Sequence, residues 1–177
     1  MNLQLRAATL ADIPAIQALY ALEVRDGVAT YEDDVPDEAQ MAQRMRELLE
    51  KGFPYLVAEL DGAFAGYAYA CSYRSRIGYR WTVEDTVYVT PAAKGMGVGR
   101  ALLAKLMQDC EALGFRQMVA VIGEPGNGAS IALHEKLGFT TIGIFPGLGR
   151  KHGRWLDTVQ MQCALGHGSR TIPATET

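Results

Sequence analysis

The segment at residues 94–100 reads KGMGVGR and has the residue types needed to bind a phosphate group. It follows the apolar and β-branched run 86–89 and precedes the apolar-periodic segment 101–107, so a strand, a glycine turn and a helix start are predicted to meet there. The first N–H groups of a helix have no partner within it, and the helix dipole places partial positive charge at that end. Lys94 and Arg100 add full charges beside it. The segment therefore predicts an anion site for a phosphate-bearing ligand.

The spacing of the glycines excludes two common phosphate loops. A dinucleotide-binding G-x-G-x-x-G would need glycine where Arg100 or Leu102 stands, and the Gly-Lys-Ser/Thr ending of a Walker loop is absent. What remains is a basic residue, Lys94, followed at fixed spacing by Gly97 and Gly99. The alternative is an ordinary glycine-rich turn, which the flanking strand and helix make less attractive.

An acidic pair interrupts the predicted strand at residues 81–90. Glu84 and Asp85 stand among apolar and β-branched residues, and an acid inside a strand requires an explanation. One explanation is a solvent-facing edge residue or an ion pair with Arg80; the other is catalysis. In a regular strand the two side chains point to opposite faces, although a bulge could exchange them.

Composition excludes several classes of protein. The 177 residues are 49% hydrophobic and 21% charged with a net charge of −3, so one globular domain is expected and no basic field is present to attract nucleic acid. Three widely spaced cysteines, without a C-x-x-C pair, predict reduced thiols and no metal site. The N-terminus lacks the apolar stretch of a signal peptide, and no apolar run approaches the length of a membrane span. We therefore expect a cytoplasmic protein without membrane contact.

Periodicity and turn residues predict an alternation of strands and helices. The predicted strands are 3–8, 54–60, 64–72, 81–90, 117–122, 139–145 and 156–165. The first predicted helix follows an N-cap at Thr9, with Asp12 three residues on, and ends at Asp26; the other predicted helices are 37–51, 97–113 and 129–137. The resulting order, βααβββαβαββ, indicates an α/β (α+β) layer fold in one domain, residues 1–165. The polar tail, residues 166–177, is predicted to be flexible.

Four segments resemble one superfamily. Residues 133–139 (LHEKLGF) are similar to the helix-to-strand signature of the GNAT superfamily of N-acetyltransferases. Residues 81–89, 119–123 and 151–157 resemble its phosphinothricin and methionine sulfoximine N-acetyltransferase subgroup, and the resemblance covers roughly residues 3–165. It implies a mixed, mostly antiparallel sheet flanked by helices, acetyl-CoA as co-substrate, and a homodimer with its site near the interface.

The resemblance assigns the coenzyme to the glycine-rich segment and the strand before it. The implied pyrophosphate-binding residues are Lys94, Gly95, Met96, Gly97, Val98, Gly99 and Arg100. The strands at 81–90 and 117–122 are expected to splay, so that the pantetheine arm pairs with backbone at Val87, Tyr88 and Val89. The N–H of Val89 would then face the thioester oxygen. Asn127 is a further candidate for the coenzyme arm, with a simple turn residue as the alternative.

The resemblance also assigns the acid–base chemistry. Glu84 matches the general base of the subgroup, and its pKa must be raised by burial, or a water must relay the proton, for it to work near neutral pH. Asp85 is the second candidate. His134 stands where many members of the superfamily have a tyrosine that protonates the coenzyme sulfur, and an imidazole can donate a proton near neutrality. The alternative is a surface histidine paired with Glu135.

An arginine-rich loop precedes the strand that carries Glu84. Arg74 and Arg76 offer planar donors for a substrate carboxylate, and Tyr79 and Trp81 could form the pocket wall. The alternative is a solvated basic loop.

Two other segments could reach the same pocket. Tyr31 and Glu32 could line its mouth, and Lys151 and His152 could reach it or merely turn a hairpin. In a homodimer some of these residues would serve the neighbouring subunit.

These observations predict an acetyl-CoA-dependent N-acetyltransferase acting on the α-amino group of a small amino acid or analogue. A protein Nα-acetyltransferase is the alternative enzyme, and a non-catalytic acyl-CoA-binding sensor is the alternative from another class. None of these three functions is expected to involve a metal.

Overall fold

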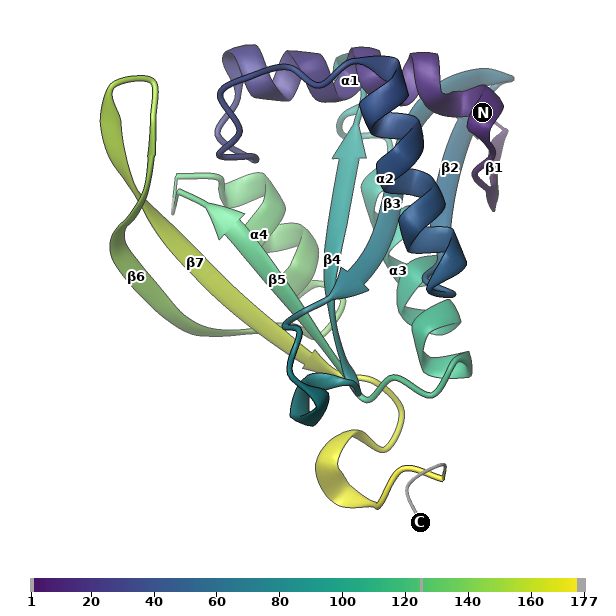
Figure 1. Ribbon diagram of the computed structural model, residues 1–177, viewed down its shortest axis with the longest axis vertical. Coiled ribbons are helices and arrows are strands. Elements are labelled where there is room, and N and C mark those ends of the chain that lie inside the picture. The colour runs from purple at the N-terminus through teal and green to yellow at the C-terminus, as the bar shows by residue number, and fades with distance from the viewer. Residues whose placement is uncertain (1, 125, 175–177) are drawn as a thin grey trace.

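The computed structural model describes residues 2–124 and 126–174, which form a seven-stranded sheet with helices on both faces (Figure 1). The strands lie in the order β1-β2-β3-β4-β5-β7-β6. They are β1 (Leu3–Ala7), β2 (Tyr55–Leu60), β3 (Ala63–Ser72), β4 (Thr82–Val89), β5 (Gln117–Gly123), β6 (Thr140–Lys151) and β7 (Arg154–Ala164). The helices are α1 (Ile13–Asp26), α2 (Glu38–Glu50), α3 (Val98–Ala112) and α4 (Gly128–Glu135). The predicted fold class and the order βααβββαβαββ are confirmed.

The sheet divides between β4 and β5, its one parallel pair among the described residues. The two strands pair from Thr82–Gln117 to Glu84–Val119 and no further. Beyond that point β4 stays paired with β3, and β5 stays paired with β7. The half-sheets therefore diverge after Glu84, as the ribbon shows (Figure 1), and the expected splay is observed.

The two faces of the sheet bury different kinds of side chain. The face under α1 and α2 holds a layer of tyrosines, among them Tyr20, Tyr67 and Tyr88. The other face packs Leu102, Leu106 and the rest of the apolar stripe of α3 against the sheet. Helix α3 follows from that stripe, whose spacing of three and four residues is typical of a buried helix face.

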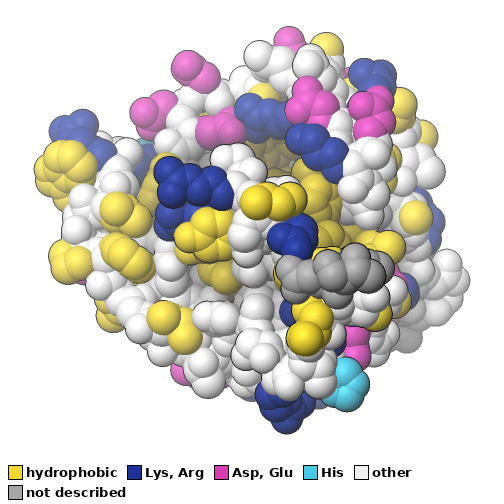
Figure 2. All heavy atoms as spheres, turned by 60° about the horizontal axis from the view of Figure 1, so that its bottom comes forward, with side chains coloured by type: hydrophobic (Ala, Val, Ile, Leu, Met, Phe, Trp, Pro, Cys, Tyr) yellow, Lys and Arg dark blue, Asp and Glu magenta, His cyan; other side chains and the backbone are white. Residues whose placement is uncertain are grey.

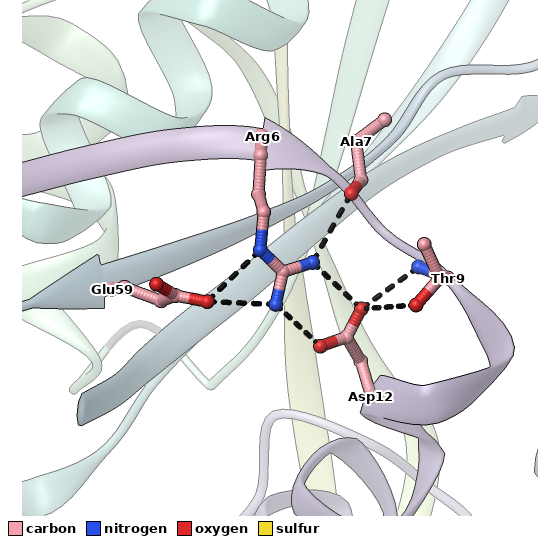
Figure 3. Close-up of polar contacts among 5 residues, drawn as sticks. All are labelled: Arg6, Ala7, Thr9, Asp12 and Glu59. Atoms are coloured by element: carbon pink, nitrogen blue, oxygen red, sulfur yellow. Dashed lines mark hydrogen bonds and ion pairs between the residues drawn. The ribbon is translucent and has the colours of Figure 1, made fainter. Parts of the chain in front are cut away.

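An ion network at the edge strand β1 sets the entry into α1 (Figure 3). The Arg6 guanidinium donates to the carboxylates of Asp12 and Glu59, at 2.6 Å and 2.7 Å for Nη2. Asp12 in turn accepts from the backbone N–H of Thr9 at 2.8 Å, which forms a capping box. The Thr9–Asp12 helix start predicted from the sequence is therefore present, and Arg6 ties it to the sheet.

The sequence predicts a loop between residues 145 and 156, and the structure shows that this prediction is wrong. Strand β6 continues six residues beyond the predicted end at 145, because bulges accommodate the Pro-Gly and Gly-Leu-Gly positions between Phe145 and Gly149. His152 and Gly153 alone form the turn, with φ of 50° and 74°. Two adjacent residues with positive φ are typical of the two-residue hairpin turn that matches strand twist. Lys151 and Trp155 thus lie in strands.

The C-terminal segment after β7 packs beside Arg116, the residue that precedes β5. A 3-10 turn at Gly168–Arg170 follows β7, and Arg116 Nη2 donates to the carbonyl of Thr171 at 3.0 Å. The domain boundary at 165 and the flexibility of the tail remain predictions, and residues 175–177 lie outside the described residues.

Candidate active site

The start of α3 presents several backbone N–H groups that have no partner within the helix. Gly95 and Gly97 adopt φ of 79° and 82°, a left-handed conformation that favours glycine. The first bond within the helix runs from Ala101 N–H to Gly97 O at 3.0 Å, so the N–H groups of Val98, Gly99 and Arg100 precede the helical ladder.

The rest of the segment faces solvent or packs beneath the turn. Lys94, Met96 and Arg100 are exposed, whereas Val98 is buried and anchors the turn. A side chain at Gly99 would crowd Val89 and Leu133, at 3.3 Å and 3.4 Å. The turn therefore presents backbone donors and two cations to an anion, and close packing of Gly99 holds it against the end of β4.

The backbone of β4 faces the gap left by β5. Thr90 N–H bonds to Ala65 O on the β3 side at 2.9 Å. Because N–H and C=O groups in an antiparallel ladder alternate in direction, the groups of Val87 and Val89 point toward the gap. Tyr88 lies between them with its ring in the tyrosine layer. The gap therefore offers the main chain of Val87 and Val89 to an extended ligand, whereas the backbone of Tyr88 faces β3. Pairing of a coenzyme with these residues remains a prediction.

Glu84 lies where the half-sheets separate. The register of β3 with β4 is regular from Gly66–Val89 to Ser72–Val83, so no bulge exchanges Glu84 with Asp85. Glu84 shares a face with Tyr88, under α1 and α2, and pairs across the ladder with Cys71. Burial, and secondarily the charge of Asp85, raise the pKa of the Glu84 carboxyl from 4.5 to about 7. A carboxyl with that pKa can accept a proton at neutral pH.

Cys71 is not a competing nucleophile. Burial and the charges of Glu84 and Asp85 raise the pKa of its thiol to about 12. The thiolate is the reactive form, so this cysteine remains inert at neutral pH.

Asp85 and His134 meet on the opposite face. Nε2 of His134 lies 3.0 Å from Oδ2 of Asp85, with both side chains at most 5% exposed. Nδ1 of the same ring donates to the carbonyl of Ser130 at 2.7 Å. Both nitrogens of His134 are therefore engaged, and its predicted transfer of a proton to sulfur would require the ring to leave Asp85. The surface pairing with Glu135 is not observed, since His134 is buried.

The arginine loop lies at the lower end of the sheet. The Arg74 guanidinium stands over the rings of Tyr73 and Tyr79, at 5.2 Å and 5.7 Å from their centroids. Arg76 is exposed and precedes a 3-10 turn at Ile77–Tyr79. Figure 2 turns this end of the molecule forward and shows Lys and Arg side chains around a hollow with hydrophobic side chains in it.

The neighbouring Trp81 does not form a wall by stacking on the tyrosines. Its ring instead carries the Arg80 guanidinium, 5.1 Å from the centroid. Of the predicted substrate residues in this loop, the structure brings Arg74 and Tyr79 together.

The loop between α1 and α2 is fixed to the far half-sheet. Lys151 is 2% exposed and donates from Nζ to the carbonyls of Thr30 and Glu23, at 2.7 Å and 3.2 Å. His152 Nε2 lies 3.1 Å from the carbonyl of Gly27. The ammonium of Lys151 is thus committed to the loop backbone, and burial lowers its pKa.

Tyr31 secures the same loop, and its partners were missed in the sequence. Its hydroxyl is hydrogen-bonded to that of Thr158 at 2.7 Å, and its ring lies against Gly149. Glu32 forms an ion pair with Arg44 of α2 at 2.8 Å. No local signal in the sequence points to these partners, because Gly149 falls in the segment that the sequence predicts as a loop.

Asn127 caps α4. Its side-chain oxygen accepts from Ser130 N–H at 3.3 Å. Contact with a coenzyme arm remains a prediction for its amide nitrogen.

Within residues 2–124 and 126–174, no group of three or more His, Cys, Asp or Glu side chains is arranged to hold a metal ion. Over the same part of the chain, no helix has the length and apolar character needed to cross a membrane.

Comparison with known proteins defines the class. A model of the acetyltransferase (GNAT) domain matches residues 5–160. A phosphinothricin N-acetyltransferase of Alcaligenes faecalis is 49% identical over 162 residues, covering 92% of this chain and 82% of that protein. An L-methionine sulfoximine/L-methionine sulfone acetyltransferase of Salmonella typhimurium is 43% identical over 163 residues, covering 91% and 94%.

A solved structure agrees with both. The crystal structure of a GNAT superfamily phosphinothricin acetyltransferase from Sinorhizobium meliloti in complex with AcCoA superposes with a TM-score of 0.95 at 49% identity, covering 100% of this chain and 96% of that one. The chain belongs to the GNAT acetyltransferase family. It is an N-acetyltransferase, as the sequence predicted.

Proposed function

We propose that this enzyme transfers the acetyl group of acetyl-CoA to the α-amino group of a small amino acid or analogue of the phosphinothricin and methionine sulfoximine type. The observation that carries the proposal is the Glu84 carboxyl, with a pKa of about 7, at the point where β4 and β5 part. The names of the relatives support the substrate class.

Coenzyme binding uses the start of α3 and the gap. The N–H groups of Val98, Gly99 and Arg100 and the side chains of Lys94 and Arg100 receive the pyrophosphate, for which a helix N-terminus is suited. The pantetheine arm enters between β4 and β5 and pairs with the backbone of Val87 and Val89. This brings the thioester near Glu84.

The reaction needs one proton acceptor. An amino acid arrives as ammonium, and Glu84 takes a proton from it, directly or through a water. The neutral amine attacks the thioester carbonyl carbon, the C–N bond forms, and the C–S bond breaks to release the thiolate of CoA. A base of this kind contributes about 10²–10⁴-fold to the rate.

The oxygen that becomes negative faces the Val89 N–H. A donor aimed at such an oxygen contributes about 2.7–4 kcal/mol. A simple thiol has a pKa of about 8.5, so the thiolate leaves without a dedicated acid near neutral pH.

Arg74 is the proposed carboxylate anchor. Its guanidinium stays over Tyr73 and Tyr79, which keeps the planar donors pre-oriented for an α-carboxylate. Arg76 and Tyr31 complete the proposed acceptor site.

The test is thiol release from acetyl-CoA over a panel of amines. Methionine sulfoximine, methionine sulfone and phosphinothricin should be used well, and an N-terminal peptide poorly. Glu84→Gln should lower kcat/KM at least tenfold and leave acetyl-CoA binding by calorimetry near normal, whereas Glu50→Gln, an exposed acid of α2, should change neither. Preference for the peptide would favour a protein Nα-acetyltransferase, and binding without turnover would favour a sensor.

We further propose a homodimer through β6 and the start of β7. β6 is an edge strand and exposes Ile142, Ile144 and Leu148 at 52–61%, beside Trp155 at 68%. The hairpin forms the left edge of the sheet in the ribbon view (Figure 1). Contiguous apolar surface of this kind is typical of an interface, and an isologous pairing places the same patch on both subunits.

Sedimentation tests the dimer. Ile144→Asp should give monomers, and Ile172→Asp, which changes a more exposed apolar residue of the C-terminal segment, should not. A monomeric wild-type protein would contradict the proposal. A cytoplasmic location is also proposed, which the three free cysteines support.

A further inference from the structure

A buried ion pair crosses the gap between the half-sheets on the face opposite Glu84. Asp85 is the first residue of β4 beyond the last pair with β5, Glu84–Val119. His134 lies in the last turn of α4, the helix that follows β5 in the chain. Their 3.0 Å contact therefore joins the two half-sheets where backbone hydrogen bonding has just ended.

The protons on the His134 ring follow from its partners. The Ser130 carbonyl can only accept, so Nδ1 carries a hydrogen. Nε2 faces a carboxylate, and with Asp85 ionised it carries a second hydrogen. Burial lowers the pKa of His134, but the hydrogen bond and charge of Asp85 and the Ser130 carbonyl outweigh it, so the net shift is upward. The end of a helix also favours a cation.

Within residues 2–124 and 126–174, neither Asp85 nor His134 forms a second ion pair. On its own face Asp85 lies near Cys110 of α3, whose thiol pKa burial raises to about 12. Cys71 of β3 lies on the other face, across from Glu84, and is likewise neutral. The His134 ring meets the edge of Phe139 at 4.9 Å. Glu135 and Lys136, the neighbours in the chain, are exposed.

The charge of this pair acts on Glu84. Asp85 raises the pKa of the Glu84 carboxyl, after burial. A cationic His134 partly offsets the Asp85 charge that Glu84 experiences. Removing the negative charge of Asp85 should therefore lower the pKa of the Glu84 carboxyl, and removing the positive charge of His134 should raise it.

We propose that Asp85 and His134 form a strut that fixes the width of the gap between β4 and β5 and sets the proton affinity of Glu84. His134 is then a positioning residue that keeps its protons, and it does not supply one to the departing sulfur. The inference rests on the proposed function, since it concerns the same base and the same coenzyme channel.

The experiment compares Asp85→Asn, His134→Gln and the exposed neighbour Glu135→Gln. The readouts are the pH profile of kcat/KM and the dissociation constant of acetyl-CoA measured by calorimetry. The acidic limb should move to lower pH in Asp85→Asn and to higher pH in His134→Gln, each by about half a unit or more. Both variants should weaken acetyl-CoA binding several-fold, and Glu135→Gln should match the wild type.

Two outcomes would overturn the strut. One is an unchanged acidic limb in both variants; the other is loss of the basic limb in His134→Gln, which would make His134 the acid for sulfur. The titration of His134 can also be measured without turnover, which keeps this part of the test independent of the proposed function. The chain has three histidines, so the imidazole C–H signals can be followed by NMR.

In the wild type His134 should titrate above 6.5, and in Asp85→Asn it should titrate lower. A wild-type value at or below 6.5 would reject the strut even if a variant fails to fold. Activity retained by Glu84→Gln would reject the proposed base and leave this titration valid.

Discussion

The ring of Tyr31 fills the space that a side chain at Gly149 would need. A Cβ at Gly149 would lie 2.2 Å from Cε2 of Tyr31. Together with the Tyr31–Thr158 hydrogen bond, this contact holds the α1–α2 loop on the half-sheet that does not carry Glu84. These contacts therefore join segments more than 100 residues apart in the chain.

Gly149→Ala should displace Tyr31 and loosen this loop. We expect the free energy of unfolding to fall by about 1–3 kcal/mol, measured by urea denaturation, and KM for the amine to rise. Gly143→Ala is the matched control, because no atom lies within 4 Å of that position on the same strand. Equal losses in both variants would show that a glycine in β6 matters only for strand geometry.

Glu84→Gln should stabilise the protein at alkaline pH. The folded-state pKa of about 7 lies above the ordinary 4.5, so between these values the native state binds more protons than the unfolded state and stability falls as pH rises. Removing the charge should raise the free energy of unfolding by about 1–3 kcal/mol at pH 8.

Below pH 4.5 the same substitution should have little effect, because the carboxyl is then protonated in both states. Thermal unfolding at pH 4 and pH 8 measures the difference, and Glu50→Gln serves as the exposed control. A destabilised Glu84→Gln at pH 8 would contradict the raised pKa.

Lys151→Met should remove the Lys151 donor from the carbonyl of Thr30, and it should leave the carbonyl of Glu23 with only the Gly27 N–H. We expect a loss of about 1–3 kcal/mol and faster hydrogen exchange in residues 27–33. The exposed Lys136→Met should stay within about 0.5 kcal/mol of the wild type. Unchanged exchange in the loop would mean that Tyr31 and His152 hold it without Lys151.

Lys94→Ala and Arg100→Ala should each weaken acetyl-CoA binding by about 2–5-fold, the range for exposed charge pairs. kcat should stay near the wild-type value, and the loss should shrink at high salt because exposed charges are screened. Lys51→Ala, at the exposed end of α2, is the control. A salt-independent loss would point to altered packing of the turn.

Local signals in the sequence determined the family, the order of elements and the glycine turn before α3. Each depends on residues close in the chain: apolar spacing, the Thr9–Asp12 cap, and glycines at positions that require positive φ. The sequence-based prediction of a loop between β6 and β7 was wrong for the same reason. Pro146 and three glycines are typical of a loop, and only their pairing with β7, which local sequence does not specify, makes this segment a strand.

Tertiary structure alone decided the chemistry of the charged residues. Glu84 was identifiable as an unusual acid in a strand, but its pKa depends on burial, which local pattern does not specify. His134 pairs with Asp85, 49 residues away, and Lys151 binds the loop 121 residues away. Such partners meet only when the half-sheets pack, since the free energy that joins them comes from the whole core rather than from their own sequence neighbourhoods.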